Sequence, residues 1–114
     1  MAARESERGT VTAELAVGLP VVLVVLVAVL TLTAASTAQM RALDAARAGA
    51  RAVAVGEGPG AVRAAVERVG GPGAELTLAH EGEWVQVTVT RPVAQGGWAG
   101  PLRATGSATA WVEP

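Results

Sequence analysis

The sequence contains no Cys, Phe, Tyr or Lys, and its only His is His80. The lack of Cys excludes disulfide bonds and thiolate metal sites. All nine positively charged side chains are Arg, and they nearly balance the ten carboxylates to give a net charge of −1. A chain without a basic surplus lacks the electrostatic footprint of a nucleic-acid-binding protein, and one with so few aromatic residues is poorly suited to a ligand pocket. We therefore expect no nucleic acid and no small-molecule substrate.

The few residue types that serve in catalysis do not assemble into a recognisable centre. His80 stands beside Glu81 and Glu83 at a turn, and these three residues supply neither a full metal-ligand set nor an acid pair within a pocket. Three Gly-rich stretches lack the Lys and the following helix of a phosphate-binding loop, so we expect them to be turns: residues 56–60, 70–73 and 96–100. The sequence therefore predicts no metal, no cofactor and no enzymatic activity.

A long apolar run is the strongest feature of the sequence. Residues 15–32, LAVGLPVVLVVLVAVLTL, are 18 residues without a charge, and a helix of about 20 such residues crosses the hydrocarbon core of a bilayer. Val dominates the run, but a backbone in lipid must satisfy its own hydrogen bonds, so we expect a helix. Pro20 removes one backbone donor, which predicts a kink or local loosening. Arg4 and Arg8 precede the run and favour a cytoplasmic N-terminus.

The helical pattern continues beyond the apolar run. Residues 34–55 are rich in Ala, contain no Pro and show apolar residues at helical spacing. This predicts one continuous helix from about residue 11 to residue 55, which the breaker GEGPG then ends. A second, short helix is expected to begin near Pro59, because Pro suits a first helical turn, and to end at the Gly-rich stretch 70–73.

The remaining sequence alternates between apolar and polar residues, as strands do. We expect strands at residues 74–80, 84–90 and 103–112, with a hairpin connection of residues 81–83 between the first two. One face of the third strand has small residues, which let a helix approach a sheet closely. The predicted fold class is therefore α+β, with a long N-terminal helix that is half transmembrane and half soluble, a short second helix and a small three-stranded antiparallel sheet.

The junction before the apolar run carries the residues with a functional pattern. Gly9 and Thr10 end the polar leader, Glu14 is an isolated carboxylate at the mouth of the run, and Pro20 follows six residues later. A carboxylate costs about 2.5–3.5 kcal/mol at the centre of a bilayer, so Glu14 favours a positively charged partner. The arrangement resembles the class III, type IV prepilin-like signal. Together with the sequence AARAGAR that ends near residue 51, it resembles the TadE-like family of the tight-adherence (Tad/Flp) pilus system over about residues 9–51.

The resemblance implies a role for each of these residues. In that family a membrane prepilin peptidase cuts after the Gly, the new N-terminal residue is often methylated, and the Glu guides assembly. Here Thr10 becomes the first mature residue, and we expect Glu14 to pair with its α-amino group, within one chain or between two. Leu15 stands where many members have Phe, and the chain from Gly56 onward carries no motif of the family.

These expectations define an organisation and a set of partners. Residues 1–9 are a cytoplasmic leader open to cleavage, 10–33 a transmembrane helix, 34–55 its extracytoplasmic continuation and 56–114 a small extracytoplasmic α+β domain. The implied location is the cytoplasmic membrane, and the implied function is that of a pseudopilin or minor pilin in secretion or adhesion. The implied partners are membrane lipid, other pilins or pseudopilins, the pilus assembly machinery and prepilin peptidase.

Two other functions fit parts of the sequence. A conventionally secreted protein would use residues 1–38 as a signal peptide with a cleavage site at 36–38, although the apolar run exceeds the usual length of about 7–15 residues. An uncleaved membrane-anchored protein would bind a partner through its sheet. Trp84 and Trp111 fall on the polar faces of their strands and Trp98 lies in a loop. Each of these three is compatible with either packing or partner contact.

Overall fold

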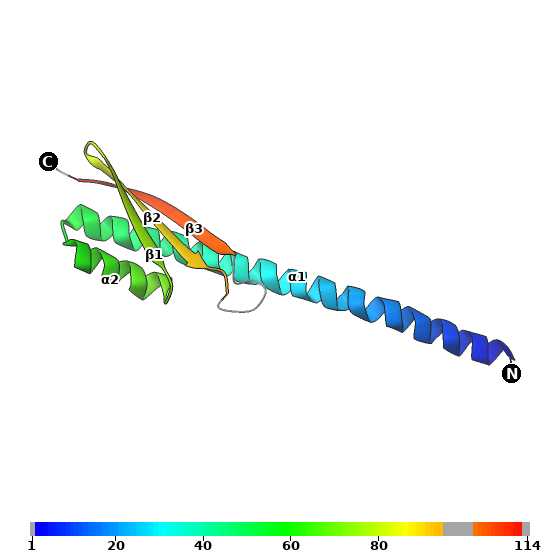
Figure 1. Cartoon of the computed structure of the whole chain (residues 1–114). Coiled ribbons are helices and arrows are strands. Elements are labelled where there is room, and N and C mark those ends of the chain that lie inside the picture. The colour runs from blue at the N-terminus through cyan, green and yellow to red at the C-terminus, as the bar shows by residue number, and fades with distance from the viewer. Residues whose placement is uncertain (1, 95–101, 113–114) are drawn as a thin grey trace. The chain divides into compact units, whose positions relative to one another are not determined.

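A computed structural model of the chain (Figure 1) describes residues 2–94 and 102–112, with side chains from residue 7 onward. The chain divides into two compact units, Met1–Leu32 and Thr33–Pro114. The elements are α1 (Ala2–Val55), α2 (Pro59–Gly70), β1 (Glu75–Glu81), β2 (Trp84–Pro92) and β3 (Arg103–Trp111). This confirms the predicted α+β fold class and the order of its elements.

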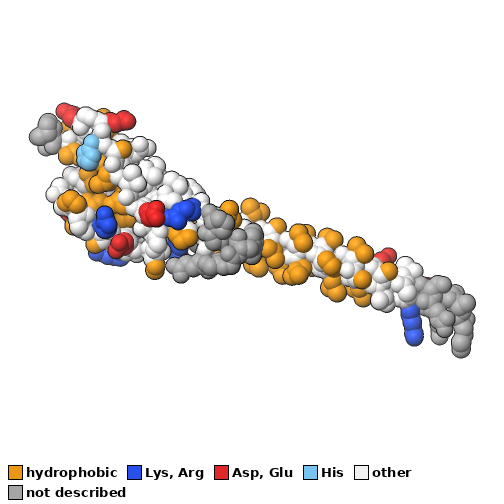
Figure 2. Space-filling view, viewed as in Figure 1, with side chains coloured by type: hydrophobic (Ala, Val, Ile, Leu, Met, Phe, Trp, Pro, Cys, Tyr) orange, Lys and Arg blue, Asp and Glu red, His pale blue; other side chains and the backbone are white. Residues whose placement is uncertain are grey.

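The first unit consists of the N-terminal part of α1. The helix begins at Ala2, not near residue 11 as we expected, because the Ala, Arg and Glu residues of the leader are good helix formers. It continues through Pro20 without ending. From Val11 to Leu32 the large apolar side chains, apart from the half-buried Val27, are at least 52% exposed, and Figure 2 shows them along the visible face of the helix. In the described part of the chain, one helix is long and apolar enough to cross a membrane.

The second unit contains the antiparallel sheet, in the order β1-β2-β3. The strand alternation sorts the residues of β2 as predicted, because Val85, Val87 and Val89 are at most 3% exposed. Gly82, with φ at +60°, makes the turn between β1 and β2. The apolar face of the sheet is therefore the inner one, and the other face is open to solvent.

Both helices cover the inner face of this sheet (Figure 1). Ala side chains of α1, Val66 of α2 and the three Val residues of β2 form one buried cluster. The approach is closest at Gly106 of β3, where a Cβ would collide with the backbone of Ala42 and Leu43 in α1. The Nε2 atom of Gln39 also donates a hydrogen bond of 2.6 Å to the carbonyl oxygen of Thr105. The small residues predicted on one face of the third strand thus allow the backbone of β3 to contact the backbone of α1.

Helix α2 begins and ends where its sequence signals predict. Pro59 occupies the first turn after the N-cap residue Gly58, a position in which the missing N–H of Pro costs nothing. The C-cap residue Gly71 has φ at +79°, and its N–H donates a hydrogen bond of 2.9 Å to the carbonyl oxygen of Glu67. The chain then turns directly into β1.

Candidate functional site

The four residues singled out at the junction all lie on α1 and all face outward. Gly9, Thr10, Glu14 and Pro20 are exposed, and a Cβ added at Gly9 would meet no atom within 4 Å. Glu14 lies four residues beyond Thr10, so both occupy the same face of the helix, one turn apart. Within the described structure Glu14 forms no ion pair. The helix therefore places an open carboxylate one turn from the residue that cleavage after Gly9 would make the N-terminus.

The Gly9–Thr10 peptide bond lies inside the helix. Proteases act on extended backbone, so a cut at this bond requires the helix to unwind locally. A Gly in a helix interior destabilises the helix by roughly 0.5–1 kcal/mol relative to Ala. Gly9 therefore lowers the free energy of opening the helix at the bond where cleavage is predicted.

The outer face of the sheet ends in an exposed aromatic pair. Trp84 and Trp111 are register partners on β2 and β3 and are 54% and 46% exposed. The Nε1 atom of Trp111 donates a hydrogen bond of 2.9 Å to Oε2 of Glu83, which orients the indole ring. Glu81 is the register partner of Trp84 on β1 and is also exposed. We call Glu81, Glu83, Trp84 and Trp111 the Trp–Glu patch.

A groove of about 450 Å³ runs between α1 and α2. We call it the Ala groove, and it is lined by Ala48, Arg51, Ala52, Val55, Glu57, Ala61, Ala64, Ala65 and Arg68. No strand residue lines this groove, so it opens on the side of the helices that faces away from the sheet. Neither Arg51 nor Arg68 forms an ion pair with any described residue. The groove therefore combines small apolar side chains with two available guanidinium groups.

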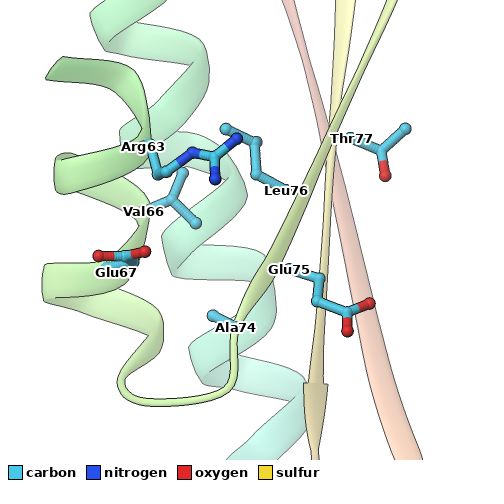
Figure 3. A pocket seen from close by; sticks show the side chains of 7 residues that line it. All are labelled: Arg63, Val66, Glu67, Ala74, Glu75, Leu76 and Thr77. Atoms are coloured by element: carbon cyan, nitrogen blue, oxygen red, sulfur yellow. The ribbon is translucent and has the colours of Figure 1, made fainter. Parts of the chain in front are cut away.

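A smaller groove of about 340 Å³ lies between α2 and β1, at the free edge of the sheet. Figure 3 shows Arg63 extending from α2 toward Leu76, whereas the carboxylate of Glu67 stays beside the helix. The remaining charged residue that lines it is Glu75, which pairs at 3.4 Å with Arg103. This groove therefore combines apolar side chains with one Arg and two Glu residues.

The other sequence candidates occupy turns and strand ends. His80 is exposed near the end of β1, and Glu81 and Glu83 flank the turn at Gly82. Among residues 2–94 and 102–112, no three His, Cys, Asp or Glu residues lie close enough together to hold a metal ion. Trp98 and the Gly-rich stretch 96–100 lie outside the described residues.

Sequence reasoning missed the Trp–Glu patch and the Ala groove. The alternation of apolar and polar residues placed Trp84 and Trp111 on the polar faces of their strands. It does not determine the register between two strands joined by a loop, so it could not show that the two Trp residues are neighbours. The Ala groove has a readable signal in the sequence, because Ala48 and Ala52 on one helix and Ala61 and Ala65 on the other recur at a spacing of four residues.

Comparison with known protein families supplies the last observation. Residues 9–51 match the family model described as TadE-like protein. No curated protein and no solved structure matches the chain. The matched segment begins at Gly9, includes Glu14 and Pro20, and ends at Arg51 on the helical part of the second unit. Over residues 9–51 this chain is therefore similar to the TadE-like family, which is the resemblance that its sequence predicted.

Proposed function

We propose that the protein is a pseudopilin or minor pilin, a membrane-anchored assembly component of a Tad/Flp-type pilus system that serves secretion or adhesion. It lies in the cytoplasmic membrane with its N-terminus inside and its C-terminal domain outside. One observation carries the proposal: the segment that matches the TadE-like model, residues 9–51, contains Gly9, Glu14 and Pro20 on one exposed apolar helix. An assembly role of this kind needs a membrane helix and protein partners, and it needs no cofactor.

Cleavage between Gly9 and Thr10 is the first step that we propose. A prepilin peptidase removes residues 1–9 and with them the charges of the leader, two Arg and two Glu. The new α-amino group of Thr10 then lies at the start of the helix, and Glu14 lies one turn away from it. A carboxylate near a helix N-terminus gains about 0.3–1 kcal/mol from the helix dipole. Before the cut Glu14 lies in the middle of a helix without an ion-pair partner among the described residues. After the cut it lies near a positively charged amine and near the favourable end of the helix dipole.

Pairing of Glu14 is the second step. An isolated carboxylate at the edge of an apolar segment resists movement toward the bilayer centre. If a neighbouring helix places its Thr10 amine at the depth of Glu14 in the membrane, the two charges pair and the cost of moving the carboxylate into the bilayer is removed. The pair also fixes how far the two helices are shifted along each other. Glu14 therefore acts as a positioning group for subunits within the membrane.

The N-terminus of the mature protein tests the proposal. Mass spectrometry of the membrane fraction is expected to find Thr10, unmodified or methylated, as the first residue. Met1 or Ala2 would contradict the cleavage and leave an uncleaved anchor. Gln39 in the medium would indicate a conventional signal peptide, although Ala38 is only 2% exposed and α1 continues through this site without a break.

Replacing Glu14 with Gln tests the pairing step. The amide keeps the shape of the side chain and removes its charge, so membrane insertion is expected to stay unchanged. Charge-assisted hydrogen bonds contribute about 1.5–3 kcal/mol, and 1.4 kcal/mol corresponds to a factor of about ten. We therefore expect co-purification with partner pilins to fall at least about tenfold.

The matched control for this variant is Glu7→Gln. Glu7 is another exposed carboxylate of the same helix, but it lies in the leader that cleavage removes. Its loss is expected to leave co-purification unchanged. Equal behaviour of the two variants would show that Glu14 has no special part in assembly.

A further inference from the structure

The Trp–Glu patch and the Ala groove lie on opposite sides of the second unit. The patch belongs to the outer face of the sheet, whereas the groove opens on the helices that cover the inner face. Both lie at the same end of the unit. Helix α1 meets Gly106, the register partner of Val89, at Ala42 and Leu43, and it meets Val87 at Gly49, so its residues beyond Gly49 lie toward the Trp84 end of β2. Two neighbouring copies can therefore present unlike surfaces to each other at one level.

The two surfaces are complementary in charge. The patch carries the carboxylates of Glu81 and Glu83, and neither forms an ion pair with a described residue. The groove carries Arg51 and Arg68 against one carboxylate, that of Glu57. Contact between two patches would bring four Glu side chains together, and contact between two grooves would bring four Arg side chains together. Charge therefore opposes both like-with-like contacts and favours patch against groove.

The surfaces are also complementary in shape and chemistry. Ala side chains leave room for a flat indole ring, and the exposed Val55 at the end of the groove, 74% exposed, adds an apolar contact. A guanidinium group placed over the face of Trp gains about 0.5–1 kcal/mol even at an exposed site. The Glu83 carboxylate already orients the ring of Trp111, so this ring loses little conformational entropy on binding.

We propose that copies of this chain bind one another head-to-tail, with the Trp–Glu patch of one copy in the Ala groove of the next. In this arrangement the second copy is shifted perpendicular to the plane of the sheet and is not rotated. Residues 33–55 of the two α1 helices then stay parallel, as is required when both chains are anchored in one membrane. Unlike surfaces that meet in this way leave a free patch and a free groove at the two ends, so the contact propagates along a row of subunits. This inference deepens the proposed function by naming a contact between subunits.

The size of the contact sets where it operates. A stable interface in solution buries about 800 Å² on each partner, more than two half-exposed indole rings and their neighbours provide. Anchoring in a membrane raises the effective concentration of the second copy and strengthens a weak contact without adding area. We therefore expect the contact in membranes, and the test uses the full chain in that setting.

Cross-linking tests the contact without background, because the chain has no Cys. Ala64→Cys marks the groove and Thr109→Cys marks the outer face beside Trp111. With a short bis-maleimide reagent in membranes, a chain that carries both changes is expected to form a ladder of multimers. Each single variant alone is expected to remain monomeric, and the two single variants together are expected to give dimers only. A chain with Ala64→Cys and Thr77→Cys, an outer-face position away from the patch, is the control and is expected to cross-link about tenfold less.

Charge reversal identifies the groups responsible. Glu83→Arg is expected to reduce the ladder at least about tenfold, and Arg51→Glu with Arg68→Glu in the same chain is expected to restore it. Restoration shows that the first change did not unfold the domain. No ladder from the Ala64→Cys/Thr109→Cys chain, or a ladder indifferent to charge reversal, would overturn the inference.

The N-terminal mass, measured on the same membranes, separates this inference from the proposed function. A chain that begins at Thr10 and forms no ladder overturns the contact and leaves the pseudopilin proposal standing. A chain that begins at Met1 or Ala2 and forms the ladder supports the contact, and it overturns the pseudopilin proposal.

Discussion

Replacing Gly9 with Val is expected to abolish the proposed cleavage after this residue, so that the protein accumulates with Met1 or Ala2 as its first residue. The side chain meets nothing in the chain itself, since a Cβ at this position has no atom within 4 Å. A loss of cleavage in this variant would therefore reflect poorer recognition by the peptidase and not a change in the fold. A β-branched residue blocks a site that accepts Gly, and it also removes the backbone freedom that allows the helix to unwind. Mass spectrometry of the membrane fraction measures the result.

The Gly9→Ala variant separates these two causes. Restoring helix stability by roughly 0.5–1 kcal/mol slows a step that requires unwinding by about two- to fivefold, because 1.4 kcal/mol corresponds to a factor of about ten. We therefore expect slowed cleavage with Ala and none with Val. Gly18→Val is the matched control, since Gly18 lies on the same helix and its Cβ would also meet nothing within 4 Å. If Gly9→Val were cut as fast as the unmodified chain, the site of cleavage would lie elsewhere.

The second large effect is expected at Gly106. A single methyl group there would overlap the backbone of Ala42 and Leu43, and a backbone cannot rotate away as a flexible side chain does. Overpacking of this kind costs about 1–3 kcal/mol. In a domain of this size, 1 kcal/mol lowers the melting temperature by about 4–8 °C. Gly106→Ala is therefore expected to melt at a clearly lower temperature, as measured by the Trp fluorescence of the full chain in detergent.

Two other glycines calibrate this result. Gly60 lies in the first turn of α2 with open space around it, so Gly60→Ala is expected to raise the melting temperature slightly through helix propensity. Gly49 is intermediate, because its Cβ would lie 2.8 Å from Cγ2 of Val66 and 3.0 Å from Cγ1 of Val87. The expected order of stability is Gly60→Ala, then Gly49→Ala, then Gly106→Ala. A Gly106→Ala protein as stable as the Gly60→Ala protein would show that α1 and β3 are not in backbone contact.

The order and type of the elements follow from local patterns. The charge-free run, the Gly-rich breakers and the alternation of Val85, Val87 and Val89 each determine one element through its own periodicity. The start of α1 was predicted wrongly because the leader was interpreted as a signal sequence, although its Ala, Arg and Glu residues favour a helix. What local patterns do not contain is the pairing of distant segments, such as Gln39 with Thr105.

The candidate site divides in the same way. Gly9, Thr10, Glu14 and Pro20 could be found from sequence because they form a linear motif within a single helix. The Trp–Glu patch could not, because it brings together residues from three strands whose register depends on the whole sheet. A surface assembled across strands becomes visible only after the fold is known.

Helix α1 carries both the long apolar segment and a large share of the hydrophobic core, and this has a mechanical consequence. Figure 1 shows β3 lying along the part of α1 that belongs to the second unit. Gln39 and Leu43 lie next to Thr105 and Gly106 in this contact. Tension applied along α1 therefore loads the Gln39–Thr105 hydrogen bond and the close contact at Gly106 in shear. A pull on the apolar segment is therefore carried into the core by the continuous helix itself, without a separate linker.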